Sequence, residues 1–311
     1  MDLYQLKTFF TLAKEKNFTQ AAQRLFVTQS AVSHALKKLE TSVGTPLVKR
    51  EGRALSLTRA GHALFRSCEK IFYEIEKADQ EIAGICKEKT IRIRLGCTVE
   101  FGTSILINHV KPFLDAHPDI HLDFYFSHHL AAPLERDEVD LIVDCMEHSQ
   151  PNLEKIYLFR ENYVAVGSPD FIREHGIRSL DDLAGVNILS GDKQLRWWRN
   201  FLAAIPEEKQ SCLKKVVEIN HIRGLINGAV SGLGIAFVPK YTVVGELAEG
   251  ILQDPFPWIN PQADHFTIFI KKEKKEFARN RALIDYLTRL KPRELGMETG
   301  ETPSSKSPRS R

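Results

Sequence analysis

The sequence predicts a small helical domain with a β wing, a long linker helix and a two-lobed α/β domain. Three observations lead to this organisation. Two short amphipathic helices occupy residues 18–40, an apolar repeat at alternating spacings of four and three runs from Leu64 to Ile85, and strand-like and helix-like segments alternate after residue 90. Helical segments repeat their apolar residues about every 3.6 positions and half-buried strands every two, so the three regions differ in period.

The second helix of the N-terminal pair has one apolar and one polar face. On a wheel of about 100° per residue, one sector collects Ala31, Val32, Ala35, Leu36 and Leu39, and the opposite sector collects Ser30, Ser33, His34 and Lys37. Short hydroxyls, an imidazole and a cation suit base edges and phosphates. The alternative is an ordinary surface helix, since amphipathic helices are abundant.

Local signals predict where these elements begin and end. Thr19 is expected to cap the first helix, and Thr28 or Gln29 stands where the second begins. Gly44 and Pro46 end the second helix. The apolar residues expected to hold the two helices at a fixed angle are Phe18, Ala21, Ala22, Leu25 and Val27. The basic residues that flank a turn at Gly52, and so predict a hairpin wing, are Lys49, Arg50 and Arg53.

Charge separates the head from the rest of the chain. Residues 1–60 hold 10 Lys+Arg and 4 Asp+Glu, a net charge of +6. The remaining residues hold 33 and 36, a net charge of −3, so the overall +3 conceals a basic head. A polyanion is therefore the expected partner of the head, with binding that weakens as salt rises.

The stretch from Leu6 to Gly61, LKTFFTLAKEKNFTQAAQRLFVTQSAVSHALKKLETSVGTPLVKREGRALSLTRAG, resembles the winged helix-turn-helix domain of the LysR-type transcriptional regulators without a gap. The resemblance implies that double-stranded DNA is the partner. It implies major-groove contacts by Gln29, Ser30, Ser33, His34 and Lys37, with Thr28 at the head of the helix, and flanking contacts by Arg50 and Arg53 of the wing. His34 stands where many members have Arg, which puts the base preference there in doubt.

A linker helix is predicted from Thr58, its expected cap, to about Lys87. Its apolar seam consists of Leu64, Cys68, Ile71, Ile75, Ala78, Ile82 and Ile85. About thirty residues make a helix of roughly 45 Å, and a narrow apolar stripe on a charged rod indicates a second copy of the chain. The alternative is that the stripe packs on the helix's own domain.

A homodimer would present two recognition helices to two half-sites of an imperfect inverted repeat. The resemblance implies, further, that dimers associate into tetramers through the C-terminal domains. RNA polymerase is an expected partner if the protein is an activator.

After a short charged break at residues 87–90, seven apolar runs predict strands, at 91–96, 121–126, 139–143, 163–166, 186–189, 235–238 and 266–270. The segments between them that predict helices are 103–116, 131–136, 194–204, 222–231 and 277–290. Alternation of strands and helices favours parallel sheets of the α/β type. About 200 residues exceed the needs of one small sheet, which suggests two lobes.

This region also resembles the effector-binding domain of the same family, with IRLGCT, HPDIHLDF, VDLIVD and GAVSGLGIAFVP in the expected order. The resemblance implies a fold like that of periplasmic solute-binding proteins, with two lobes, two crossover strands and a ligand cleft. The expected domains are 1–58 for DNA binding, 59–89 for the linker helix, and 90–293 for effector binding. Within the last, lobe I is about 90–160 plus 265–293 and lobe II about 161–264; 294–311, at the end of a Ser-, Pro- and charge-rich stretch, should be a disordered tail.

Ligands of open α/β sheets lie beyond the carboxyl ends of the strands. That rule selects Thr98, Glu100, Phe101, Ser127, His128, Asp144, Ser190 and Asn220 as effector contacts, with Cys145 and Gly191 beside them. The resemblance implies that Thr98, which matches a Ser or Thr effector contact of the family, is the foremost of these.

Glu100 has two interpretations. In the first turn of a helix starting near Gly102 it would offset the helix dipole. At the mouth of a cleft it would repel a carboxylate effector by about 1–4 kcal/mol at 4 Å. If Glu100 and Asp144 both point inward, the effector is expected to carry an amine or another cationic group, and calorimetry showing no heat with polyamines or basic amino acids but clear binding of a dicarboxylate would reject this.

Three further groups of residues have structural alternatives. Trp197 and Trp198, between Arg196 and Arg199, could stack on an aromatic effector, but they lie about 100° apart on a helix, so one should belong to the core. The five cysteines form no CxxC pair, which favours a reducing compartment. Cys97 and Cys145 are candidates for redox sensing or, in the alternative, small buried apolar residues. The eleven histidines match no metal-site spacing.

No phosphate-binding loop, GxSxG or HExxH motif supports an enzyme, and no cofactor beyond an unidentified small-molecule effector is expected. With neither a signal peptide nor a membrane-spanning apolar run, no membrane partner is expected and the expected location is the cytoplasm. Three functions stay open: a ligand-responsive DNA-binding regulator, which the sequence favours; an architectural DNA binder indifferent to small molecules; and a solute-binding or enzymatic domain with an incidental N-terminal module.

Overall fold

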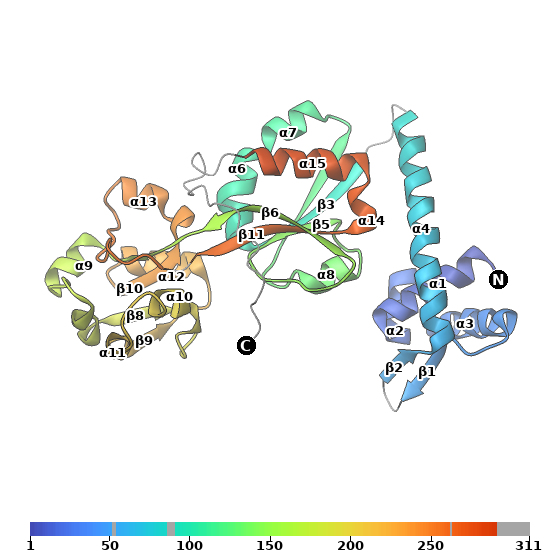
Figure 1. Ribbon diagram of the computed structural model, residues 1–311, viewed down its shortest axis with the longest axis horizontal. Coiled ribbons are helices and arrows are strands. Elements are labelled where there is room, and N and C mark those ends of the chain that lie inside the picture. The colour runs from blue at the N-terminus through green and yellow to red at the C-terminus, as the bar shows by residue number, and fades with distance from the viewer. Residues whose placement is uncertain (52–53, 86–90, 262, 291–311) are drawn as a thin grey trace, which may run out of the picture. The chain divides into compact units, whose positions relative to one another are not determined.

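The computed structural model describes residues 1–51, 54–85, 91–261 and 263–290. The chain forms two compact units, of which the first comprises Met1–Arg92 with two short segments, Asp119–His121 and Ala132–Val139, and the second comprises the rest (Figure 1). Within the described ranges, no helix combines the length and the apolar character needed to cross a membrane.

Three helices form the head of the first unit: α1 (Leu3–Glu15), α2 (Phe18–Leu25) and α3 (Gln29–Val43). The side chain of Thr28 caps α3 by accepting the Ala31 N–H at 3.2 Å, and α3 ends at Gly44 in a left-handed conformation. The expectation that Thr19 caps α2 is wrong. Asn17 is the cap, because its side-chain oxygen accepts the N–H groups of Thr19 and Gln20, and Thr19 already lies inside the helix.

The wing and the linker helix follow directly. Strands β1 (Val48–Glu51) and β2 (Ala54–Leu57) pair antiparallel, which confirms the expected hairpin, and α4 runs over Arg59–Ile85. Thr58 caps α4, since its hydroxyl accepts the Gly61 N–H at 3.0 Å. The Gly52 turn and Arg53 lie outside the described residues, as do the charged break at 87–90 and the tail at 294–311.

The apolar seam of α4 divides into two parts. Leu64, Cys68 and Ile71 pack against the core of the head, with Cys68 fully buried and the other two partly buried, so this part of the seam contributes to the helix's own domain. Phe10 of α1 holds α4 to the head, because its ring stacks on Phe72 at a centroid distance of 5.2 Å and packs against the tilted ring of Phe65 at 5.0 Å. The exposed part of the seam comprises Ile75, Ala78 and Ile82, and the side chain of Ile85 lies outside the described residues.

Apart from residues 91–92 and 120–121, which belong to the first unit, the second unit contains a five-stranded and a four-stranded sheet (Figure 1). The first has the order β4 (Ile120–Phe126), β3 (Ile91–Cys97), β5 (Leu141–Asp144), β11 (Asp264–Lys271) and β6 (Leu153–Glu161). The second has the order β7 (Tyr163–Val166), β10 (Ile235–Pro239), β8 (Asn187–Ser190) and β9 (Lys215–Glu218).

The α/β architecture of this part of the chain is confirmed, and both sheets combine parallel and antiparallel pairs. β3 pairs with β5, and β8 with both β9 and β10, in parallel, but β11 is antiparallel to β5 and β6, and β7 is antiparallel to β10. The reason is that β6 leads from the first sheet towards the second and β11 leads back, as Figure 1 shows. These are the two crossover strands that the family resemblance implies.

Helices cover both sheets. Near the first sheet lie α5 (Val99–Phe101), a π-helical segment (Gly102–Leu106), α6 (Ile107–His109), α7 (Lys111–Ala116), α14 (Lys272–Lys275) and α15 (Ala278–Arg289). Helix α8 (Ala131–Glu135) belongs mostly to the first unit. Around the second sheet lie α9 (Pro169–Glu174), α10 (Arg199–Leu202), α11 (Glu207–Gln210), α12 (Ile222–Val230), α13 (Val244–Ala248) and 3₁₀ turns at Leu180–Gly185, Arg196–Trp198 and Lys240–Thr242. The helix expected at 103–116 thus begins earlier, at Val99, and is interrupted, and the one expected at 194–204 is shorter.

Alternate residues of β10 serve two separate cores. Ile235 and Phe237 face the core that contains Trp198, and Ala236 and Val238 face the core built on α12. Because successive side chains of a strand point to opposite faces, a strand covered on both faces is apolar throughout, as all five residues of β10 are buried.

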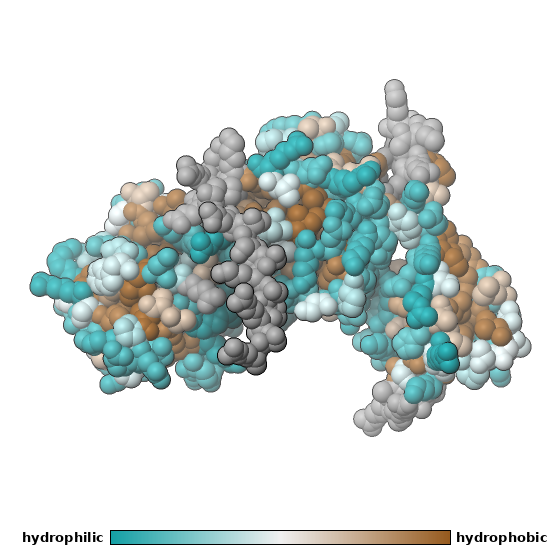
Figure 2. All heavy atoms as spheres, viewed as in Figure 1, coloured by the Kyte–Doolittle hydropathy of each residue, from teal (hydrophilic) through white to brown (hydrophobic). Residues whose placement is uncertain are grey.

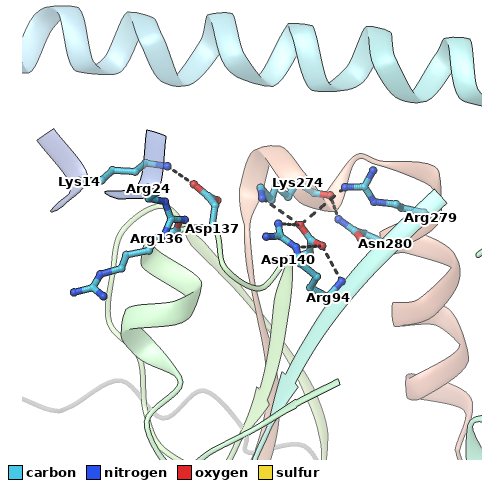
Figure 3. A network of polar contacts seen from close by, with 9 residues as sticks. All are labelled: Lys14, Arg24, Arg94, Arg136, Asp137, Asp140, Lys274, Arg279 and Asn280. Carbon is cyan, nitrogen blue, oxygen red and sulfur yellow. Dashed lines mark hydrogen bonds and ion pairs between the residues drawn. The ribbon is translucent and has the colours of Figure 1, made fainter. Parts of the chain in front are cut away.

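An ion cluster is buried at the first sheet of the second unit. Asp140, just before β5, accepts the Arg94 N–H at 2.8 Å and Arg94 Nη2 at 3.0 Å, and Lys274 Nζ lies 3.3 Å away (Figure 3). Arg279 Nη2 is 4.0 Å from the same carboxylate, and Asn280 donates to the Lys274 carbonyl at 2.8 Å. The cluster connects β3, β5, α14 and α15.

Candidate DNA-binding helix and effector cavity

The polar face of α3 is open to solvent. Val32, Ala35, Leu36 and Leu39 are buried, which confirms the predicted apolar sector. The side of α3 proposed to contact DNA is exposed throughout, at Thr28, Gln29, Ser30, Ser33, His34 and Lys37. The hydroxyls of Thr28 and Ser30 lie 2.9 Å apart at the N-terminus of the helix. Hydroxyls and backbone N–H groups at a helix N-terminus are suited to phosphate oxygens.

Phe26 is a feature of this surface that sequence reasoning missed. It ends α2 in a left-handed conformation, with φ of 56°, and 95% of its surface is exposed. An aromatic side chain so exposed in the turn before α3 is unusual for a core-forming residue type. The sequence offered one indication: Phe26 directly follows Leu25, the last residue of the apolar spacing of α2, and so lies outside that apolar face. Of the wing residues, Arg53 and the side chain of Arg50 lie outside the described residues.

A cavity of about 330 Å³ lies in the second unit, between residues of both sheets. Four of the eight expected effector contacts line it: Thr98, Glu100, His128 and Asn220. Thr98 precedes α5 and Glu100 lies in its first turn, so Glu100 both offsets the helix dipole and reaches the cavity. The two interpretations of Glu100 are therefore compatible.

The other four expected contacts are not among the lining residues. Phe101 is fully buried against Phe159 and Phe266. Asp144 accepts hydrogen bonds from His148 at 2.8 Å and the Met146 N–H at 3.0 Å. The Ser127 and Ser190 hydroxyls accept local backbone N–H groups, of His129 and Asp192. Local hydrogen bonds and core packing thus occupy these side chains, and the condition that Glu100 and Asp144 both point inward is not met.

Sequence reasoning missed most of the opposite wall. Glu161 ends β6, Tyr163 begins β7 and Tyr241 follows β10, and all three line the cavity together with Asp192. Cys145, set beside the expected contacts, also lines it. Tyr241 follows the carboxyl end of a strand that was predicted, so the strand-end rule could have selected it. Glu161 could be placed at the cavity only if the strand that it ends, β6, had been predicted.

The carboxyl group of Glu161 is held in an unusual environment. Burial raises its pKa to about 7, against a lowering effect of the Tyr163 hydrogen bond, and the nearby Asp264 raises it further. Tyr163 Oη lies 2.8 Å from Glu161 and 3.0 Å from Asp264. The single hydroxyl proton of Tyr163 can be donated to only one of these two carboxylates at a time. An additional proton on the carboxyl group of Glu161 therefore reduces the repulsion between the two acids.

The paired tryptophans have separate roles. Trp198 is fully buried and donates its indole N–H to the Leu189 carbonyl at 3.0 Å, so it belongs to the core. Trp197 lines the cavity and lies edge-to-face with Tyr163 at 6.5 Å. The expectation that one of the two is a core residue is confirmed.

The thiols of Cys97 and Cys145 do not have the environment of a redox sensor. Burial raises the pKa of each, with the Asp144 carboxylate adding to the shift of Cys97 and Glu161 to that of Cys145. Reactive thiols need the opposite shift, because the thiolate is the nucleophile. Among the described residues, no group of three or more His, Cys, Asp or Glu side chains is arranged to hold a metal ion.

Two family models match the chain. The model of the bacterial regulatory helix-turn-helix protein, lysR family, matches residues 3–62, and that of the LysR substrate binding domain matches residues 87–291. The first match covers the three-helix head, the wing and the start of α4, and the second covers the two sheets and the cavity.

Several named proteins are similar to the chain in sequence or in fold. The chain is 27% identical over 266 residues to the glycine cleavage system transcriptional activator homolog of Haemophilus influenzae, covering 86% of this chain and 87% of the relative. Its fold is similar to that of ArgP from Mycobacterium tuberculosis (TM-score 0.68, 21% identity, 97% and 100% of the two chains). It is also similar to full-length LysG from Corynebacterium glutamicum with bound effector Arg (TM-score 0.63, 18% identity, 95% and 98%).

Proposed function

The chain belongs to the LysR family of DNA-binding transcriptional regulators with an effector-binding domain, and we propose that it reads an inverted-repeat operator as a homodimer under the control of a small molecule in the described cavity. The observation that supports this most is that one chain combines an exposed polar helix face on a basic head with a cavity whose wall holds polar atoms that no described residue pairs with.

The proposed DNA contacts are the exposed residues of α3 and its cap, from Thr28 to Lys37. Lys37 carries the cation of this face, and Ser33 and His34 lie beside it with short side chains that can approach base edges. Arg50 and Arg53 of the wing are expected to contact the flanking backbone. The proposal includes the cytoplasm as the place of action and RNA polymerase as a partner if the outcome is activation.

Lys37→Ala is expected to weaken binding to all duplexes and to lower the dependence of log K on log salt by about 1, because one phosphate contact is lost. The measurement is fluorescence anisotropy on a duplex selected from a random library, at several salt concentrations. Lys111→Ala is the matched control, since Lys111 is an exposed lysine of the second unit, paired with Asp115. Equal salt slopes for Lys37→Ala and the wild type would contradict the proposed orientation of α3.

The homodimer is proposed to form through the exposed part of the α4 seam. Ile75 and Ile82 are 37% and 50% exposed. Isoleucine is usually buried, so two exposed isoleucines on an otherwise charged helix indicate a surface that binds a partner. Figure 2 shows hydrophobic residues, in brown, beside the hydrophilic residues of α4. A second copy of α4 would cover these side chains. Association of dimers into tetramers stays a prediction of the family resemblance.

Ile82→Glu is expected to raise the dimer dissociation constant at least about tenfold, or about 1.4 kcal/mol, because a charge would enter the seam. Sedimentation equilibrium measures it. The control is Lys77→Glu, which introduces the same side chain at an exposed position on another face of α4. A dimer of unchanged strength in Ile82→Glu would show that the seam is not the interface.

The regulator and an architectural DNA binder differ in their response to small molecules. A footprint on the selected duplex, recorded with and without the ligands described below, separates them. A footprint that changes supports the regulator, and one that never changes supports the architectural binder. The absence of any sequence-specific complex would contradict both.

A further inference from the structure

Three buried polar atoms of the cavity wall have no hydrogen-bond partner among the described residues: Glu100 Oε1, Thr98 Oγ1 and Tyr241 Oη. Each belongs to a residue that is at most 7% exposed. Buried polar atoms are almost always paired, and leaving one unpaired costs about 1–3 kcal/mol. These three atoms therefore mark where a ligand makes its polar contacts.

The kind of contact follows from the chemistry of Glu100. An ionised carboxylate only accepts hydrogen bonds, so the group that meets Oε1 is a donor. Its other oxygen, Oε2, lies 3.7 Å from the His128 imidazole, which is half-exposed at the edge of the cavity. A donor that also carries positive charge gains most from this position.

The remaining charges of the wall have the same sign. Glu100, Glu161 and Asp192 line the cavity, and its lining residues, all within the described part of the chain, include two imidazoles, those of His128 and His221, but neither Lys nor Arg. Asp192 is already engaged, since it accepts the N–H groups of Gln194, Arg196 and Trp197. An anionic effector would meet Glu100 and Glu161 without a compensating cation, at a cost of about 1–4 kcal/mol for each charge pair at 4 Å.

The rest of the cavity is suited to an apolar body. Trp197 and Tyr163 present aromatic surface, and Ile219, Ile222 and Leu225 add aliphatic surface. Aromatic faces also attract cations. A cavity of about 330 Å³ is at the small end of ligand-binding sites.

We propose that the effector is a small organic cation, with an ammonium or guanidinium group between Glu100 and Glu161 and an apolar body against Trp197 and Tyr163. This inference rests on the proposed function, because it assigns a chemical class to the ligand of the same cavity. Thr98 and Tyr241 supply the neutral hydrogen-bond partners of the cationic group.

The site should release a proton on binding. Glu161 is faced by Tyr163, Asp264, Cys145, Glu100 and Tyr241, and burial raises its pKa to about 7. A cation favours the ionised carboxylate and lowers that pKa. Affinity should therefore rise as the pH increases through about 7 and level off above it. The Glu161→Gln variant, which cannot ionise, should lack this part of the pH dependence.

The test uses the full chain and a panel of cations, namely agmatine, putrescine, arginine and tryptamine, with succinate and benzoate as anions. Thermal unfolding identifies binders and titration calorimetry at pH 7.5 measures the dissociation constant. We expect at least one cation and neither anion to bind, and Glu100→Gln to weaken the cation at least tenfold. The control, Glu147→Gln, removes an exposed carboxylate that pairs with Lys155 and should change affinity less than twofold.

Three outcomes would overturn the inference: binding of an anion but of no cation, binding of no cation in a preparation that still binds its selected duplex, or unchanged cation affinity in Glu100→Gln. The duplex measurement separates this failure from that of the proposed function. Loss of sequence-specific DNA binding counts against the regulator, whereas intact DNA binding without a cation effect counts against the chemical class alone.

Discussion

Asp140→Ala is expected to destabilise the second unit by about 3–5 kcal/mol, the cost of removing one partner from a buried ion pair. Asp140 is 1% exposed, and its removal leaves the Lys274 and Arg279 side chains, both 9% exposed, without the carboxylate that lies between them. The Arg94 backbone N–H also loses its acceptor. Denaturant unfolding followed by tryptophan fluorescence measures the effect, since Trp197, Trp198 and Trp258 all lie in this unit.

Two variants qualify that result. Asp181→Ala removes a carboxylate that pairs with Lys209 at the surface, and exposed pairs contribute about 0–1 kcal/mol. Asp140→Asn keeps an acceptor for Arg94 and removes only the charge, so it should fall between the two. A loss in Asp140→Ala no larger than in Asp181→Ala would show that the cluster does not hold β3 and β5 to the C-terminal helices.

The same carboxylate predicts the direction of a pH effect. Burial by itself raises the pKa of Asp140, but Lys274 and Arg94 lower it more, so the net shift is downward. A lowered pKa stabilises the folded state above the pKa of the unfolded chain, and that stability is lost as the pH falls through the folded value. The difference in stability between the wild type and Asp140→Asn should therefore persist at pH 5 and shrink only below the ordinary range of aspartate.

The sequence was sufficient for the head because its signals are local. The wheel of α3, the Thr58 cap and the basic hairpin are each specified within a few residues, and the structure has all three. Thr19 is not the cap because α2 begins one residue before it, at Phe18, and the Asn17 side chain accepts the N–H groups of Thr19 and Gln20. The spacing of the α4 seam predicts an apolar stripe but not what covers it. The first part of the stripe, at Leu64, Cys68 and Ile71, packs against the helix's own domain.

The cavity was predicted in part because its walls come from distant strands. Rules for parallel sheets select residues after each strand, and they found Thr98, Glu100, His128 and Asn220. Strand β6 was missed because charged residues lie on both sides of its short apolar run, IYLF, and the strand has no clean alternation of apolar and polar residues. Glu161 and Tyr163 owe their positions to that strand and to the antiparallel start of β7, which no local pattern places at a ligand site.

Gly61→Ala is expected to disrupt the head and abolish DNA binding. A Cβ atom at Gly61 would lie 2.0 Å from the carbonyl oxygen of Leu47 and 3.3 Å from Leu57 Cβ. The Leu47 carbonyl cannot move freely, because it accepts the Thr58 N–H at 3.0 Å, and the Leu47 N–H donates to Glu40 Oε1 at 2.7 Å. Overpacking typically lowers the free energy of unfolding by about 1–3 kcal/mol, and we expect a clash with the backbone to cost at least the upper value of this range.

The start of α4 would then have to separate from the wing. The contact that orients α3 and the hairpin would be lost with it. Calorimetry should show a lowered transition for the head and an unchanged one for the second unit, together with an affinity for the selected duplex reduced at least tenfold. Gly245→Ala is the matched control, since a Cβ at Gly245 of α13 meets no atom within 4 Å. In a helix, alanine is more favourable than glycine by up to about 1 kcal/mol, so this control should be neutral or slightly stabilising. Wild-type DNA affinity and stability in Gly61→Ala would mean that α4 and the wing are not packed as closely as this contact requires.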